Sequence, residues 1–332
     1  MKHPTYFAFK PGRVCVAGLG GLALAVSLMA SNAMAQNWPS KPIRIIAPQP
    51  PGGGPDRVIR GIANGLSQRL GQQVLVEHKP GAGGNIGAIE LLRSGADGYT
   101  WMIGTESILT INPLIYKDIG FNKADLLPVN LIGSFTQVLT CNPNVGVKTV
   151  PELIAKAKTR PMSYASGGAG SPGHLTMEML LAEANVSMTH VPYRGPQPAV
   201  TDMMGGQVDC GFLVGAVVNE FVKAGRLVAL ATSSKTRSTL APDLPTVAEQ
   251  GFPTVDATFW LTAFAPRGVP KEVLDRFLKA LDESIKTPEV REAMLANSTK
   301  PEGSTPEAAK KELDQITVRW TDIAKRVNLK LD

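Results

Sequence analysis

The chain has 332 residues, of which 43% are hydrophobic and 19% charged, and its formal net charge is +6. This size and composition are typical of a globular protein with one large or two medium domains. Because the charge is mild and no run of basic residues with interleaved aromatic side chains occurs, the sequence does not favour a nucleic-acid-binding protein.

The first 35 residues have the pattern of a cleaved export signal. Lys2, Lys10 and Arg13 form a basic start, an apolar run covers residues 14–29, and Ala33-Met-Ala35 is typical of a cleavage site. The apolar run is shorter than a membrane-spanning helix requires, which favours a signal peptide over a membrane anchor. We therefore expect cleavage after Ala35 and a soluble mature protein in a bacterial periplasm, with 31 basic residues against 28 acidic ones.

Strands alternate with helices in the first part of the mature chain. The expected elements are a strand at 43–47, a helix from Pro55 to Gly71, a strand at 74–76, a helix carrying Ile86, Ile89 and Leu92, and a strand at 100–103. A turn follows each of the three strands: Pro48–Asp56, Lys79–Gly87 and Gly104–Ser107. The first two turns are rich in glycine and open helices, so they leave bare backbone N–H groups at helix N-termini. Two such helix ends side by side predict a pocket for an anionic group.

The rest of the chain continues this pattern. Further strands are expected at 137–141, 162–165, 188–191, 208–212 and 227–231, and a capping box at Thr149–Glu152 begins a helix. Glycine- and proline-rich turns cover 166–173 and 192–198, whereas the C-terminal third is expected to be helical. Helices are expected to begin at Pro270, at Pro288 and at a second capping box, Ser304–Glu307. The alternation predicts an α/β protein with a largely parallel sheet covered on both faces.

The two cysteines of the mature chain are Cys141 and Cys210. Export permits a disulfide between them, but both lie in apolar, strand-like sequence, which favours two buried thiols. Two cysteines without suitably spaced histidines do not make a zinc site, so the sequence predicts no metal.

Several motifs carry a resemblance to a known family. They are IIAPQPPGGGPDR at 45–57, VEHKPGAGGNIG at 76–87, YASGGAGSPGHL at 164–175, VPYRGPQPAVTDMMGGQVD at 191–209, KAGRLVALA at 223–231 and LPTVAEQGFP at 244–253. In this order and spacing, the mature chain resembles the substrate-binding proteins of tripartite tricarboxylate transporters, the Bug family. The resemblance covers essentially the whole mature chain.

The resemblance implies a two-lobed periplasmic-binding-protein fold of the type II-like, Venus-flytrap kind, in which each lobe has a mixed, mostly parallel sheet flanked by helices. Lobe 1 is expected to comprise residues 36–136 and 253–332, and lobe 2 residues 137–252. The implied ligand is a small carboxylate (a dicarboxylate, a tricarboxylate or an aromatic acid), and the implied partner is an inner-membrane permease. A role as a solute sensor that presents its ligand to a signalling ectodomain stays open, and a monomer is the expected state.

The same resemblance points to ligand-binding residues in both lobes. Those of lobe 1 are Gln49, Gly53, Gly54, Asp56, Gly83, Gly84, Asn85, Thr105 and Ser107, and those of lobe 2 are Ser166, Gly170, Ser171, His174 and Tyr193. Plainer roles stay open for three of them: Asp56 could stabilise a helix N-terminus, His174 could cap or pack a helix, and Tyr193 could be ordinary core.

The chain departs from the family pattern at three places. Gln49 stands where an aromatic residue is usual, and Pro55 replaces a usual Ser or Thr, so carboxylate binding would depend more on backbone amides and water. Leu213 and Val214 form an apolar wall where some members are polar or acidic. We therefore expect a ligand without an α-ammonium group.

Enzymatic alternatives find little support in the sequence. Ala169–Gly173 could be a variant nucleophile elbow with Ser171 as the nucleophile, but a serine hydrolase of that fold needs an acid and then a suitably distant histidine downstream. His174 is too close to Ser171 to act as the base. The glycine turns break the dinucleotide-binding pattern and no P-loop occurs, so we expect no cofactor and no enzymatic activity.

Overall fold

The computed structural model describes Met1 and residues 38–52 and 54–327. The predicted signal peptide (Met1 apart), Gly53 and residues 328–332 lie outside the described residues. The chain has two compact units, Met1–Ser40 and Lys41–Asp332, and the second carries the sheet. Within the described part of the chain, no helix has the length and apolar character needed to span a membrane.

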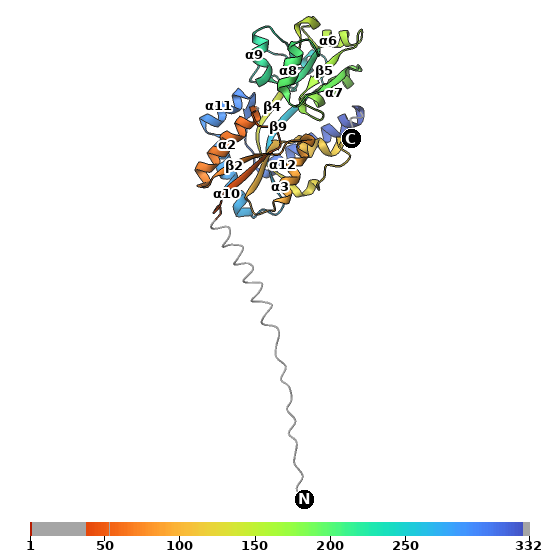
Figure 1. The fold of residues 1–332 in the computed structure, drawn as a ribbon. Coiled ribbons are helices and arrows are strands. Elements are labelled where there is room, and N and C mark those ends of the chain that lie inside the picture. The colour runs from red at the N-terminus through yellow and green to blue at the C-terminus, as the bar shows by residue number, and fades with distance from the viewer. Residues whose placement is uncertain (2–37, 53, 328–332) are drawn as a thin grey trace. The chain divides into compact units, whose positions relative to one another are not determined.

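The sheet of the second unit has ten strands (Figure 1). These are β1 (Ile43–Ala47), β2 (Val74–His78), β3 (Thr100–Thr105), β4 (Leu126–Cys141), β5 (Ser163–Ser166), β6 (Thr189–Pro192), β7 (Cys210–Val214), β8 (Val228–Thr232), β9 (Thr258–Pro266) and β10 (Thr299–Pro301). Eight of them follow the order β2-β1-β3-β9-β4-β7-β5-β6, while β8 and β10 pair with β4.

The sheet is mixed. Strand β1 runs parallel to β2 and β3, and β5 runs parallel to β6 and β7. By contrast, β4 is antiparallel to β7, β8, β9 and β10, and β3 is antiparallel to β9. The predicted α/β class is confirmed, but the prediction of a largely parallel sheet is wrong, because β4 and β9 form antiparallel pairs through the middle of the sheet.

The helices connect and cover the strands. They are α2 (Gly54–Leu70), α3 (Asn85–Arg93), α4 (Ser107–Thr110), α5 (Asn112–Ile115), α6 (Val150–Ala157), α7 (Pro172–Ala184), α8 (Pro196–Met204), α9 (Gly215–Lys223), α10 (Lys271–Ile285), α11 (Pro288–Ala296) and α12 (Pro306–Val327). Helix α2 packs against α10 and α11, and α12 packs against β4 and α7. Helices α6 to α9 gather around β5, apart from α2 and α10 (Figure 1).

The two predicted capping boxes differ in outcome. The Thr149 hydroxyl accepts a hydrogen bond from the Glu152 amide at 3.3 Å, which confirms the predicted start of α6. At α12 the prediction is displaced by one residue, because the Thr305 hydroxyl accepts from the Ala308 amide at 3.2 Å. The Ser304 hydroxyl instead accepts from the Leu131 amide at 2.9 Å, and so ties the start of α12 to β4.

Strand β4 changes its partners along its length. Residues 126–136 pair with β9, whereas residues 137–141 pair with β7. Ser233, which is fully buried, lies at this change: its hydroxyl accepts from the Gln137 amide at 2.9 Å and donates to the Ala257 carbonyl at 2.6 Å. One serine side chain therefore links β4 to the segment that leads back into β9.

Cys141 and Cys210 lie opposite each other on β4 and β7, and both are buried as free thiols. This agrees with the expectation of two buried thiols.

Candidate ligand-binding site

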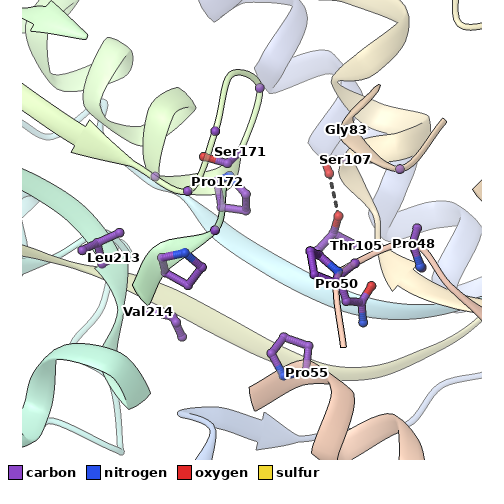
Figure 2. A pocket seen from close by; sticks show the side chains of 18 of the residues that line it. Pro48, Pro50, Pro55, Gly83, Thr105, Ser107, Ser171, Pro172, Leu213 and Val214 are labelled. Atoms are coloured by element: carbon purple, nitrogen blue, oxygen red, sulfur yellow. Dashed lines mark hydrogen bonds between the residues drawn. The ribbon is translucent and has the colours of Figure 1, made fainter. Parts of the chain in front are cut away.

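A cavity of about 450 Å³ lies among the turns that follow β1, β2, β3, β5 and β6. Its lining is Pro48, Gln49, Pro50, Pro55, Pro80, Gly81, Gly83, Gly84, Thr105, Ser107, Phe135, Gln137, Gly167, Gly168, Ala169, Gly170, Ser171, Pro172, Gly173, Arg194, Gly195, Pro196, Phe212, Leu213, Val214, Leu261, Asn297 and Thr299. In Figure 2, Ser171 and Pro172 lie on one side of the cavity, and Gly83, Thr105 and Ser107 lie on the other. This volume is in the range of small-molecule sites.

Two asparagine side chains support the turn after β2 through hydrogen bonds. Gly83 has φ of 60° and Gly84 has φ of 99°, in the left-handed region that favours glycine. The amide group of Asn112 donates to the Gly83 carbonyl at 3.1 Å and to the Asn85 side-chain oxygen at 2.7 Å. Asn85 is only 3% exposed, so its side chain supports the turn and does not line the cavity.

Two hydroxyls and a buried acid follow β3. Thr105 Oγ1 and Ser107 Oγ lie 2.8 Å apart and share one hydrogen bond, which leaves one hydroxyl hydrogen for a ligand (Figure 2). Glu106, between them, is fully buried, and burial raises the pKa of its carboxyl group to about 8 despite the hydrogen bond that it accepts from the Trp260 amide. Glu106 is therefore largely neutral at pH 7 and adds little negative charge beside the two hydroxyls.

The carboxylate of Asp56 makes its contacts with other residues of the protein. Its carboxylate accepts from the Gly52 amide at 2.9 Å, and it pairs with Arg60 at 2.9 Å and with His78 at 3.1 Å. Burial acts to raise the pKa of Asp56, but these hydrogen bonds and charges outweigh it and hold the pKa below its ordinary value. Asp56 does not line the cavity. Its contacts are those of a residue that stabilises the start of α2.

A pair of stacked histidines, of which His174 is buried, supports the turn after β5. The Gly170 amide donates to Nδ1 of His174 at 3.0 Å, and the His174 ring stacks on His190 with 3.9 Å between ring centres. His190 Nε2 lies 2.7 Å from the hydroxyl of Ser166. Burial, together with the neighbouring His190, lowers the pKa of His174 to about 4, so the imidazole that accepts from Gly170 is neutral near pH 7. Ser166 and His174 therefore lie behind the cavity wall.

The turn after β6 brings an arginine to the cavity. Arg194 lines the cavity, and the described residues offer its guanidinium no hydrogen bond or ion pair. Its neighbour Tyr193 is turned to other contacts: the phenol donates to Asp202 at 2.7 Å, and burial together with this bond raises the pKa of Tyr193 to about 12.

The backbone amides of the lining turns fall into two groups. Some donate to nearby acceptors, namely those of Gly84, Gly168, Gly170, Ser171 and Gly195. Others find no acceptor among the described residues, and these include the amides of Gly83, Gly167 and Ala169. These three unbonded amides come from the turns after β2 and β5, so both sides of the cavity present free N–H donors.

The structure thus divides the predicted site residues. Those that line the cavity are Gln49, Gly83, Gly84, Thr105, Ser107, Gly170 and Ser171. Those that lie outside the lining are Asp56, Asn85, Ser166, His174 and Tyr193. Gly53 is outside the described residues, and of Gly54 only the backbone position at the start of α2 is described. Two lining residues carry buried polar atoms without a partner among the described residues, the side-chain nitrogen of Gln49 and the hydroxyl of Ser171.

Sequence reasoning missed several lining residues. Arg194 stands inside the motif at 191–209, and its charge could have marked it. Phe135, Leu261, Asn297 and Thr299 come from distant parts of the chain, and no local pattern points to them. Together with Leu213 and Val214, the apolar side chains among these give the cavity a hydrophobic wall.

Comparisons with known proteins agree with this architecture. Residues 58–329 match the profile of the tripartite tricarboxylate transporter family receptor. The protein BugT of Bordetella pertussis is 33% identical over 315 residues, which cover 94% of this chain and 97% of BugT. A structure of Rpa4515 from R. palustris with adipate has a TM-score of 0.81 at 30% identity, over 88% of this chain and 99% of that one.

A second solved structure, the periplasmic binding protein BugD, has a TM-score of 0.80 at 28% identity and covers 88% of this chain and 99% of BugD. The fold is therefore that of the periplasmic binding proteins, and the chain belongs to the receptor family of the tripartite tricarboxylate transporters.

Proposed function

We propose that this protein captures a small carboxylate in the cavity and delivers it to a tripartite tricarboxylate permease in the inner membrane. The observation that carries the proposal is the chemistry of the lining. Among the described lining residues, Arg194 is the one charged side chain and no carboxylate occurs. Free amides and hydroxyls lie on both sides, and such donors favour an anion.

The same lining argues against a ligand with an ammonium group. A buried ammonium needs an acidic partner or several acceptors, whereas the walls offer Leu213, Val214 and Leu261. The ligand is accordingly an acid with an apolar body, in the range of dicarboxylates and aromatic acids. The adipate in the structure of the relative Rpa4515 is a ligand of this kind.

Capture proceeds by closure of two lobes, with residues 36–136 and 253–332 in the first and 137–252 in the second. The partner change of β4 between residues 136 and 137, and the link through Ser233 to Ala257, support this division. A ligand that touches both sets of turns favours the closed form by its difference in affinity for the two forms. The protein acts as a monomer in the periplasm after removal of residues 1–35.

Ser171 is a ligand contact in this account and not a nucleophile. Its hydroxyl has no hydrogen-bond partner among the described residues, and Nδ1 of the nearby His174 is occupied by the Gly170 amide. A catalytic serine needs a base within hydrogen-bond reach. Delivery to a permease is distinguished from sensing by deleting the permease: uptake of the acid is lost if the protein serves transport, whereas a transcriptional response persists if it serves sensing.

The binding proposal is tested with the purified mature protein by thermal shift and calorimetry against adipate, benzoate, citrate, aspartate and putrescine. An acid without an ammonium group is expected to raise the melting temperature, because binding to the folded state stabilises it. Putrescine, a diamine, is the control and is expected to have no effect. Saturation by aspartate at low micromolar concentration, with no response to the other acids, would contradict the assignment.

A further inference from the structure

Strands β4 and β7 bring two cysteines face to face. Cys141 is the last residue of β4, Cys210 is the first residue of β7, and the two lie directly opposite each other in the antiparallel pair. Residues opposite each other in such a pair project their side chains from the same face of the sheet. Both cysteines are 0% exposed and carry free thiols, so the structure describes the reduced form of the pair.

The neighbouring hydrogen bond shows which kind of position the pair occupies in the ladder. The Asn142 amide donates to the Asp209 carbonyl at 2.9 Å, so these two residues form a hydrogen-bonded pair. Because hydrogen-bonded and non-hydrogen-bonded pairs alternate along an antiparallel ladder, Cys141 and Cys210 form a non-hydrogen-bonded pair. The Cα atoms of such a pair are about 4.5 Å apart, within the range of about 4.4 to 6.8 Å that disulfides span. The backbone therefore suits a disulfide at this position.

The two side chains are also in contact. The Cys141 side chain forms a hydrogen bond with the Cys210 thiol, and this bond together with burial raises the pKa of Cys210 well above its ordinary value. The Cys210 thiol also lies 3.9 Å from the Ser163 carbonyl oxygen of the neighbouring strand β5. Each sulfur thus has the other cysteine within reach inside the sheet.

The environment in which the chain folds decides what becomes of such a pair. Thiols of exported proteins meet an oxidising compartment, where disulfides form and persist. A buried thiol with a raised pKa contains almost no thiolate, which is the form that attacks a disulfide, so the pair is unreactive once the protein has folded. Oxidation therefore takes place during folding, before the face of β4 and β7 that carries the two cysteines is covered.

From this juxtaposition we propose that Cys141 and Cys210 form a disulfide bond as the exported chain folds. The oxidant is itself a disulfide, that of a periplasmic dithiol oxidase in the cell or oxidised glutathione in vitro. One cysteine thiolate attacks this disulfide, forms a mixed disulfide and releases the first thiol of the oxidant. The second cysteine thiolate attacks the sulfur of the first cysteine and releases the second thiol. The two cysteines together lose two protons and two electrons, which reduce the oxidant to its two thiols.

This bond adds to the proposed function, from which it takes only the export of the chain. It lies at the end of β4 and β7 away from the cavity, where it fixes the register of the two strands. In that register Gln137 lies opposite Val214, and both residues line the cavity. The bond also closes the loop of residues 142–209, and closing a long loop lowers the entropy of the unfolded chain. We therefore expect the bond to raise the stability of the protein.

Mass spectrometry of the protein purified from the periplasm of a bacterial host tests the bond. The protein is isolated without reductant and unfolded in urea with an alkylating reagent that reacts with free thiols. The mature chain contains these two cysteines only. It is expected to take up no alkyl group, and a digest without reductant is expected to contain one peptide pair joined through Cys141 and Cys210. Uptake of two alkyl groups, or links between separate molecules, would overturn the proposal.

Melting curves measure what the bond does. Wild-type protein is expected to melt higher, by on the order of 5 °C, than the same protein unfolded and refolded with a reductant. Cys141→Ala and Cys210→Ala are the matched controls, because each keeps one thiol and cannot form the bond. Refolding with reductant is expected to leave their melting temperatures unchanged. An equal loss in wild type and in both variants would show that the reductant acts elsewhere, and would contradict a stabilising bond.

Refolding of the reduced mature chain with oxidised glutathione tests the pairing without export. The disulfide is expected to form within single molecules, and the variants are expected to stay monomeric with one alkylated thiol. A bond that forms with glutathione but is absent from the periplasmic protein would overturn the proposal for the exported chain. Ligand titrations play no part in these measurements, so a failure of carboxylate binding leaves the disulfide proposal intact.

Discussion

Lowering the pH is expected to destabilise the folded protein through His174. This imidazole is 5% exposed, accepts a hydrogen bond from the Gly170 amide and stacks on His190. Burial and the neighbouring His190 lower the pKa of His174 to about 4, from an ordinary value of 6.5. Because the unfolded chain takes up a proton near pH 6.5 and the folded protein does so only near pH 4, stability falls as the pH decreases through this window. At about pH 4.5 the loss from His174 is roughly 2.5 kcal/mol.

The measurement is urea-induced unfolding of wild type and His174→Asn at about pH 7 and about pH 4.5. Asparagine does not titrate, and its side-chain oxygen can replace Nδ1 as the acceptor for Gly170. Wild type is expected to lose about 2 to 3 kcal/mol more than the variant between the two pH values, since carboxylates affect both proteins alike. If the two proteins lose the same free energy of unfolding, the reasoning about His174 is refuted.

Three further changes are expected to have measurable effects. Ser233→Ala removes the hydroxyl that links Gln137 to Ala257, so urea unfolding should show a loss of about 2 to 3 kcal/mol, and an unchanged midpoint would contradict the link. Glu106→Gln removes an acid whose pKa is raised by burial to about 8, whereas the unfolded acid ionises near 4.5. The variant should therefore melt at a higher temperature than wild type at pH 7 and lose this advantage below about pH 4.5, and an equal or lower melting temperature at pH 7 would contradict the reasoning. Gly83→Val places a branched side chain at a φ of 60°, where even a Cβ atom would lie 3.0 Å from the Asn112 amide nitrogen. Calorimetry should therefore show carboxylate affinity at least about tenfold lower, and unaltered affinity would exclude this turn from the site.

Local sequence patterns predicted the strands whose bounds are set by neighbouring residues. Strand β1 was predicted with its observed bounds, because an apolar run interrupted only by Arg44 lies between a proline and a glycine-rich turn. The first eleven residues of β4 were missed, because Pro128, Asn130 and Gly133 interrupt its apolar pattern and two irregularities in the pairing with β9 accommodate them. Strand β9 was also missed: its antiparallel place between β3 and β4 depends on partners more than 100 residues away.

For the site, too, sequence patterns predicted the positions of some residues but not the direction of their side chains. The predicted residues Gly83, Thr105, Gly170 and Ser171 line the cavity, because turns at the ends of neighbouring parallel strands lie together. A motif does not show which way a side chain points. Asn85, for example, was named as a ligand contact, but its side chain supports Asn112 from behind the turn.

Unbonded main-chain amides on both sides of the cavity are expected to hold the anion. ¹H–¹⁵N NMR during titration with the acid that binds best measures this at each amide. Large amide-proton shifts are expected for Gly83, Gly167 and Ala169, whereas the internally bonded amides of Gly84 and Gly170 should shift little. Saturating ligand that leaves the first three amides unmoved would contradict this expectation.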